Sequence, residues 1–205
     1  MNLEQIESRE KIKFPKLFKD IYKTGAMKWM TSYTWLNEHR EELLNTPEAF
    51  MYSVESDCEP LLFEDIQERK EFIDEMNEIS GYKIKKEYNF IPFAMTGGGD
   101  IYCFIYKNEE LDNIILYEHD SDEIVSYGAD FEEFLMWQIY SAIIEWNQDI
   151  DKSILAHAEY LNYEHRILFK NRDIDAISKA AKIIEEKMDK MGQENLQEKY
   201  YDVTE

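Results

Sequence analysis

A chain of 205 residues with 44% hydrophobic and 14% aromatic side chains has the composition of a globular protein and not of a disordered one. Its 23 lysine and arginine residues stand against 44 aspartate and glutamate residues, so the formal net charge is −21. A surface of that sign repels phosphates, which argues against nucleic acid or anionic membrane as a partner and favours a basic protein. The alternative is an acidic balance that serves solubility alone.

The sequence also carries signals about its compartment. The N-terminus lacks the apolar stretch of a signal peptide, and no run of about 18 apolar residues is present to span a membrane. The two cysteines, Cys58 and Cys103, have no metal-ligand spacing, so we expect reduced thiols inside the core. These features predict a cytoplasmic protein without a cofactor.

The first third of the chain is predicted to be mostly helical. Phe14–Tyr22 has its apolar residues on one face, and Gly25 is suited to end that helix. A second, more polar helix is expected over 34–44, and Met51–Val54 has the pattern of a short strand. Residues 64–80 form an amphipathic pattern that Gly81 ends. The apolar face of this last helix is predicted to contain Ile66, Ile73, Met76 and Ile79.

The middle of the chain changes to the period of strands. Residues 82–95 look extended although they include Pro92, and Ile101–Tyr106 is apolar on both faces, which predicts a strand covered on at least one side. Two further strands and two short polar linkers indicate an antiparallel meander. The strands are Ile114–Glu118 and Ile124–Tyr127, and the linkers are Lys107–Asn113 and His119–Glu123.

Helices are expected again from Asp130, which with Glu133 resembles a capping box. Two more helices are predicted over 152–169 and 173–191. The last carries a heptad stripe shorter than a confident coiled coil requires, so docking on the domain is favoured over a dimer zipper. Residues beyond Gly192 are expected to fray.

This order of elements predicts an α+β fold, with a mostly antiparallel meander of about four to six strands flanked by helices. We divide the chain into an α+β domain over 1–147, with an inserted helix near 34–45, and a helical extension over 148–205. The expected state is a monomer or a weak homodimer.

Two segments contain residue types that can carry chemistry. Thr96–Asp100 contains three glycines but lacks the lysine and following helix of a phosphate loop, so we interpret it as a tight turn. The loop 118–123 holds four carboxylates and a histidine without the glycine and distal glutamate of a calcium loop. His157 and His165 lie eight residues apart on one predicted helix, too far to chelate unaided. We therefore predict no catalytic, cofactor-binding or metal-binding residue.

Several segments in order resemble the SUKH superfamily, which includes the Smi/Knr cell-wall regulators of fungi. The chain shows Ile6-Glu7 before Phe14–Tyr22, then Phe90–Ala94 leading into Gly97–Asp100 and Ile101–Phe104, then Ile115–Asp120, and finally Asp130–Leu135. The resemblance covers roughly residues 3–147. Thr24-Gly25-Ala26 replaces the usual glycine pair, 31–57 looks like an insertion, and the C-terminal helices lie outside the usual core.

The resemblance implies a binding scaffold without enzymatic residues. Bacterial members are similar to immunity proteins that neutralise toxins, many of them nucleases, whereas eukaryotic members are similar to adaptors. We therefore expect an immunity protein that binds a basic toxin domain. The alternatives are an adaptor with a non-toxin partner and, least favoured, a metal-dependent enzyme that uses the acids of the 118–123 loop. The predicted partner-binding residues are Asp100, Glu118, His119, Asp120, Asp122, Glu123, Glu132 and Glu133.

Overall fold

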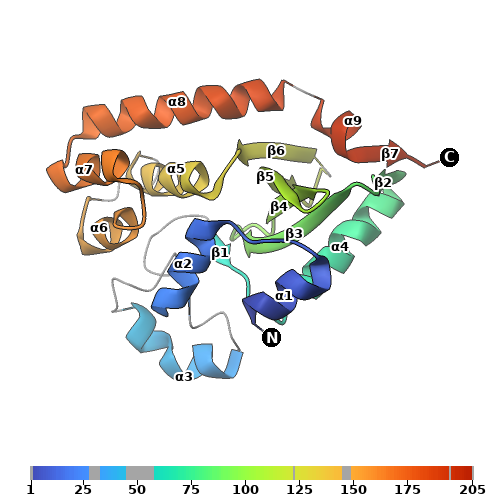
Figure 1. The fold of residues 1–205 in the computed structure, drawn as a ribbon, viewed down its shortest axis with the longest axis horizontal. Coiled ribbons are helices and arrows are strands. Elements are labelled where there is room, and N and C mark those ends of the chain that lie inside the picture. Colours follow the sequence, from blue (N-terminus) through green and yellow to red (C-terminus); the bar gives the residue numbers. More distant parts are fainter. Residues whose placement is uncertain are drawn as a thin grey trace.

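The fold is described in a computed structural model over residues 2–27, 33–44, 58–121, 123–144, 149–193 and 195–204. Over these ranges, nine helices surround a five-stranded antiparallel sheet and a separate two-stranded sheet (Figure 1). The predicted α+β class is confirmed. The predicted strand Met51–Val54 lies outside the described ranges.

The N-terminal helices are α1 (Leu3–Glu10), α2 (Lys16–Thr24) and α3 (Tyr33–Leu44). A reciprocal pair of hydrogen bonds between Asn2 and Gln5 caps α1, and Gly25 ends α2 with a φ of 86°. The helices predicted over Phe14–Tyr22 and 34–44 are thus confirmed to within two residues.

Helix α4 (Ile66–Ile79) confirms the predicted amphipathic helix but not all of its buried face. Ile66 and Ile73 are buried, whereas Ile79 is 78% exposed. At about 100° per residue, Ile79 lies about 120° around the helix from Ile73, while Asn77 lies only about 40° away. Asn77 therefore takes the inner position, and the prediction for Ile79 was wrong.

The main sheet has the order β1-β3-β4-β5-β6, and every neighbouring pair is antiparallel, which confirms the meander. Its strands are β1 (Glu59–Pro60), β3 (Tyr88–Met95), β4 (Ile101–Lys107), β5 (Glu110–Glu118) and β6 (Glu123–Gly128).

The linker predicted between β4 and β5 is shorter in the structure. Only Asn108 and Glu109 form the turn, with φ values of 49° and 75°, and β5 already begins at Glu110. Two left-handed residues in succession match the right-handed twist of the flanking strands, so a two-residue turn is sufficient. Residues 110–113, three of which are polar, belong to the strand.

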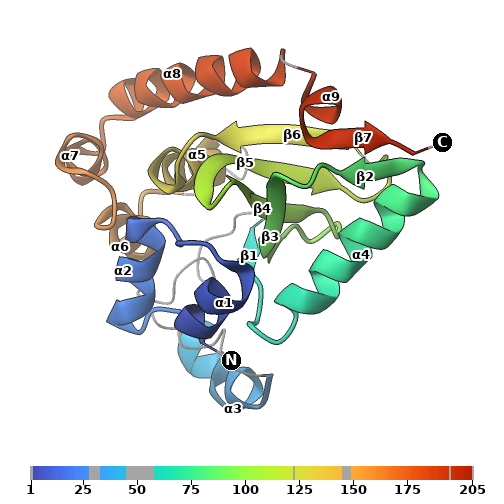
Figure 2. The ribbon, with the colours of Figure 1, turned by 45° about the vertical axis from the view of Figure 1, so that its right-hand side comes forward.

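Both faces of the main sheet are covered, where the apolar pattern of β4 predicted cover on at least one side. On one face, Phe93 and Phe104 stack with ring centroids 4.1 Å apart and belong to a core with residues of α1, α2 and α5 (Phe131–Ile144). On the other face, Cys103 and Ile105 belong to a cluster with Ile73 of α4. Figure 2 shows α4 on one side of the strands and α2 and α5 on the other.

The segment predicted as one helix over 152–169 is two helices, α6 (Lys152–Ala158) and α7 (Tyr163–Asn171). The side chain of Asn162 accepts the backbone N–H of His165 and starts α7 anew. His157 and His165 therefore lie on different helices, contrary to the prediction.

Helix α8 (Ile174–Gly192) docks on the domain, as predicted. Ile177, Ile184 and Met188 lie in the same hydrophobic cluster as the N-terminal helices, together with residues of α6 and α7. The division of the chain near residue 147 remains a prediction, but side chains from both parts share this core.

Residues 196–203 fold into regular elements, so the predicted frayed tail was wrong. It forms α9 (Leu196–Tyr200) and β7 (Tyr201–Val203), and β7 pairs with β2 (Tyr82–Ile84) (Figure 1). Aromatic side chains explain the order, because Tyr200 and Tyr201 are buried against Phe90 of β3. This pairing also splits the extended segment predicted over 82–95, whose first part belongs to a second sheet.

Candidate protein-binding site

Two hairpin turns meet at one end of the main sheet. In the register of the strands, Ile101 is opposite Tyr117 and Glu118 is opposite Glu123. The turn before β4 and the turn between β5 and β6 therefore lie at the same end, as an antiparallel meander predicts. We call this region the acidic end and define it as Asp100, Glu118, His119, Asp120 and Glu123. The predicted residue Asp122 lies outside the described residues.

Asp100 and His119 join the two turns. Oδ1 of Asp100 lies 2.9 Å from Nδ1 of His119 and accepts the backbone N–H of His119 at 3.2 Å. The backbone N–H of Asp100 donates to the hydroxyl of Thr96 at 3.0 Å. At Gly99, with a φ of 104°, an added Cβ would lie 3.4 Å from the His119 ring. The glycine turn thus makes room for the imidazole, and the interpretation of Thr96–Asp100 as a tight turn is confirmed.

His119 lies between two carboxylates. Its Nε2 is 3.0 Å from Oδ1 of Asp120, on the opposite side of the ring from Asp100. The hydrogen bond to Asp100 and the charges of both aspartates raise the pKa of His119 above its ordinary value, against a smaller opposing effect of desolvation. The imidazole therefore offsets negative charge in this turn more readily than a free histidine would.

The other acids of this end face solvent to differing degrees. The side chain of Asp120 is 91% exposed, Glu123 is exposed, and Glu118 is half-buried with its Oε2 accepting the hydroxyl of Ser121 at 3.1 Å. Within the described part of the chain, no lysine or arginine forms an ion pair with these three carboxylates. Their charge is available to a partner.

Glu132 and Glu133 do not join this group. They lie in the first turn of α5, after the far end of β6, and six strand residues correspond to roughly 20 Å. Asp130 accepts the backbone N–H groups of both glutamates, so it caps α5 as predicted.

The side chains of these two glutamates make contacts to the C-terminal helices. Glu132 accepts the backbone N–H of Asn162 at 3.1 Å and lies 3.2 Å from Nδ1 of His165. Glu133 pairs with Lys187 of α8. These contacts hold α7 and α8 against α5, which is a structural role that the capping pattern alone did not reveal.

The structure adds little that would support metal or thiol chemistry. Over the described ranges, no three His, Cys, Asp or Glu side chains are placed to hold a metal ion. Cys58 and Cys103 are both buried, and burial raises the pKa of the Cys103 thiol. In the same ranges, no helix has the length and apolar character needed to cross a bilayer.

A pocket between α4 and β2 was missed in the sequence analysis. The signal was Asn77, a polar residue four positions after the buried Ile73 and hence on the same helical face. The other wall of the pocket could not be predicted, because β2 pairs with β7 and the C-terminal segment that contains β7 was expected to fray.

Comparison with known families agrees with this architecture. Residues 2–137 match the model of the SMI1 / KNR4 family (SUKH-1), which covers more than half of the chain. The chain belongs to this family. No curated protein and no solved structure matched it. The family match ends within α5, so α6 to α9 and β7 lie beyond it.

Proposed function

We propose that this chain is a non-enzymatic binding protein of the immunity type, which neutralises a basic toxin domain by covering its cationic surface. The observation that carries the proposal is the acidic end of a chain of net charge −21, where no lysine or arginine among the described residues pairs with Glu118, Asp120 or Glu123. Membership of the SMI1 / KNR4 family supports a binding scaffold. The immunity role rests on the resemblance to the SUKH superfamily, whose bacterial members are similar to immunity proteins.

The scaffold favours recognition by these turns. Strands β4 and β5, which flank these turns, are packed on both faces, so the turns are held on a rigid base. A nuclease groove that binds phosphates is cationic, and an acidic partner can occupy the same groove. Long-range attraction then raises the association rate above the usual 10⁵–10⁶ M⁻¹s⁻¹ of weakly charged pairs, by about tenfold or more at low salt.

The proposal predicts that a gene beside that of this chain encodes a toxin domain, and that co-expression of this chain rescues cells from it. The purified pair should associate faster at low salt. Neutralising Glu118, Asp120 and Glu123 together (E118Q, D120N, E123Q) should slow association and flatten its salt dependence, as measured by stopped-flow mixing.

The matched control removes three exposed acids from the outer face of α8, which are Asp175, Glu185 and Glu186 (D175N, E185Q, E186Q). This control has the same net charge as the first variant, so an equal loss of rate in both would exclude the acidic end as the docking surface. Failure of rescue, together with the lack of any toxin-like neighbouring product, would refute the immunity function and favour an adaptor.

A further inference from the structure

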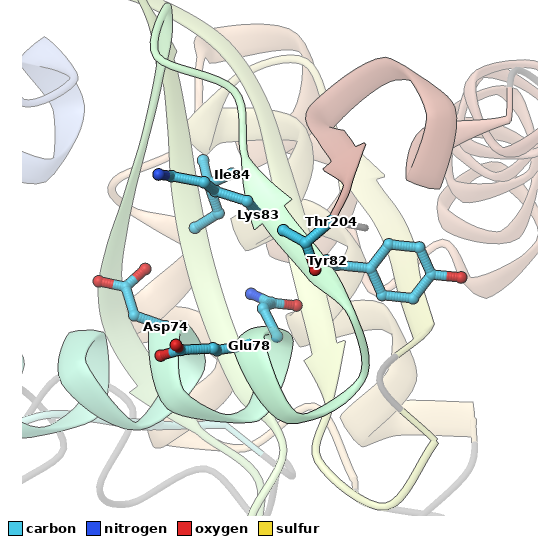
Figure 3. A pocket seen from close by; sticks show the side chains of 7 residues that line it. Asp74, Glu78, Tyr82, Lys83, Ile84 and Thr204 are labelled. Atoms are coloured by element: carbon cyan, nitrogen blue, oxygen red, sulfur yellow. The ribbon is translucent and has the colours of Figure 1, made fainter.

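A pocket of about 410 Å³ opens between the C-terminal half of α4 and the β2–β7 sheet. This volume lies within the range of small-ligand sites. Figure 3 shows Asp74 and Glu78 projecting from α4, Lys83 from β2, and Thr204 from the segment after β7. No lining residue belongs to the acidic end.

Asn77 lines this pocket and has unsatisfied hydrogen-bonding capacity. It is only 2% exposed, and among the residues that the structure describes neither its side-chain nitrogen nor its side-chain oxygen has a hydrogen-bond partner. Buried amides almost always have partners, because burial without one forfeits the bonds that water would provide. A group with one acceptor and one donor side by side, such as a peptide amide, would satisfy both atoms.

The charges of the mouth are separated between its two walls. Asp74 and Glu78 are one turn apart on α4, and Lys83 extends from β2 above them in Figure 3. Partial desolvation raises the pKa of Asp74, an effect that Glu71 increases and Lys70 opposes. A ligand with a cation near α4 and an anion near β2 would complement both walls.

We propose that this pocket binds the end of a peptide that finishes in lysine or arginine with a free carboxylate. The last peptide amide pairs with Asn77, the basic side chain with Asp74 and Glu78, and the terminal carboxylate with Lys83. This inference goes beyond the proposed function and does not rest on it, since it concerns different residues and requires no toxin.

The ligand side of the proposal is tested on the unmodified chain with short synthetic probes. Acetyl-Ala-Lys with a free carboxylate should shift amide resonances of α4 and β2 in an NMR titration. Amidation of its carboxylate, or replacement of lysine by norleucine, should each weaken binding about five- to tenfold, because each removes one charge-assisted contact. Free lysine lacks the acyl amide, so it should bind no more tightly than the amidated probe or the norleucine probe. This comparison distinguishes a site for a peptide end from a site for a free amino acid.

The protein side uses two sets of variants. Asn77→Leu should weaken the acetyl-Ala-Lys probe more than about tenfold without lowering the melting temperature, because two unpaired polar atoms leave the interior. Asn77→Ala, which lacks the bulk of leucine, should lose binding as well. The double variant D74N, E78Q should lose its preference for lysine over norleucine, whereas the control E68Q, E75Q on the same helix should keep it.

Three results would overturn the proposal. The first is the lack of any shift with acetyl-Ala-Lys at about 10 mM, where even a weak site fills. The second is equal affinity for the lysine and norleucine probes, and the third is unchanged binding by Asn77→Leu. The immunity function is tested by rescue from a toxin, whereas the pocket is tested by peptide binding. Failure of one test therefore does not refute the other proposal.

Discussion

Replacing Tyr200 tests whether the C-terminal segment closes the second face of the sheet. The ring is fully buried and packs edge-on against Tyr88, with centroids 4.9 Å apart. Its hydroxyl donates to Asp112 at 2.9 Å and accepts the side-chain N–H of the buried Asn113 at 3.2 Å. One side chain thus joins α9 to β3 and β5 by both apolar and polar contacts.

The two kinds of contact can be removed separately. Tyr200→Phe keeps the ring but leaves the amide nitrogen of Asn113 without this acceptor, which should lower the free energy of unfolding by about 1–2 kcal/mol. Tyr200→Ala also creates a cavity, for a total loss of about 3–5 kcal/mol. For a chain of this length, the melting temperature should fall by about 2–8 °C in the first variant and by about 6–20 °C in the second.

Urea unfolding followed by circular dichroism measures both losses, with Tyr163→Phe as the control. Tyr163 lies on α7 and is largely exposed, so its loss should change stability by less than about 0.5 kcal/mol. If Tyr200→Ala were as stable as the control, the C-terminal segment would not cover the sheet in solution, and the pocket formed with Thr204 would lose its basis.

Two further predictions concern the acidic end and α8. Because its folded pKa is raised, His119 should stabilise the fold fully below about pH 6.5, and this contribution should be lost as the pH rises through the folded pKa. An NMR titration should therefore place the pKa of His119 above that of free imidazole and lower in Asp100→Asn, and equal values would contradict the ion pair. Ile184→Ala should cost about 2–4 kcal/mol in urea unfolding, because the side chain is buried under α8, whereas Ile183→Ala at the exposed neighbouring position should cost far less. Similar losses at both positions would contradict docking of α8 in this orientation.

Local sequence patterns were sufficient to predict whether most segments form a helix or a strand. The apolar residues on both faces of Ile101–Tyr106 predicted a covered strand, and the stripe from Ile177 to Met188 predicted a docked helix. Each pattern lies within one element, so the periods of 2 and 3.6 residues record which side chains share a face. The same reasoning placed the two turns of the acidic end together, because consecutive antiparallel strands return to the same edge.

Where local pattern failed, the deciding contacts lie far apart in the sequence. The capping role of Asp130 was visible, but the contacts of Glu132 and Glu133 to α7 and α8 depend on how three helices pack. The break before α7 was missed because Asn162 begins a new helix inside a segment of continuous helical character.

Composition and periodicity by themselves determined that this chain is an acidic α+β protein with a meander and a docked C-terminal helix. Only the tertiary structure decided that Tyr82 pairs with Val203, that the tail is ordered, and that Asn77 faces a pocket. The physical reason is that a strand of three residues gains its stability from its partner, and here that partner is separated by most of the chain. Neither segment has a sequence pattern of its own that predicts such a pairing.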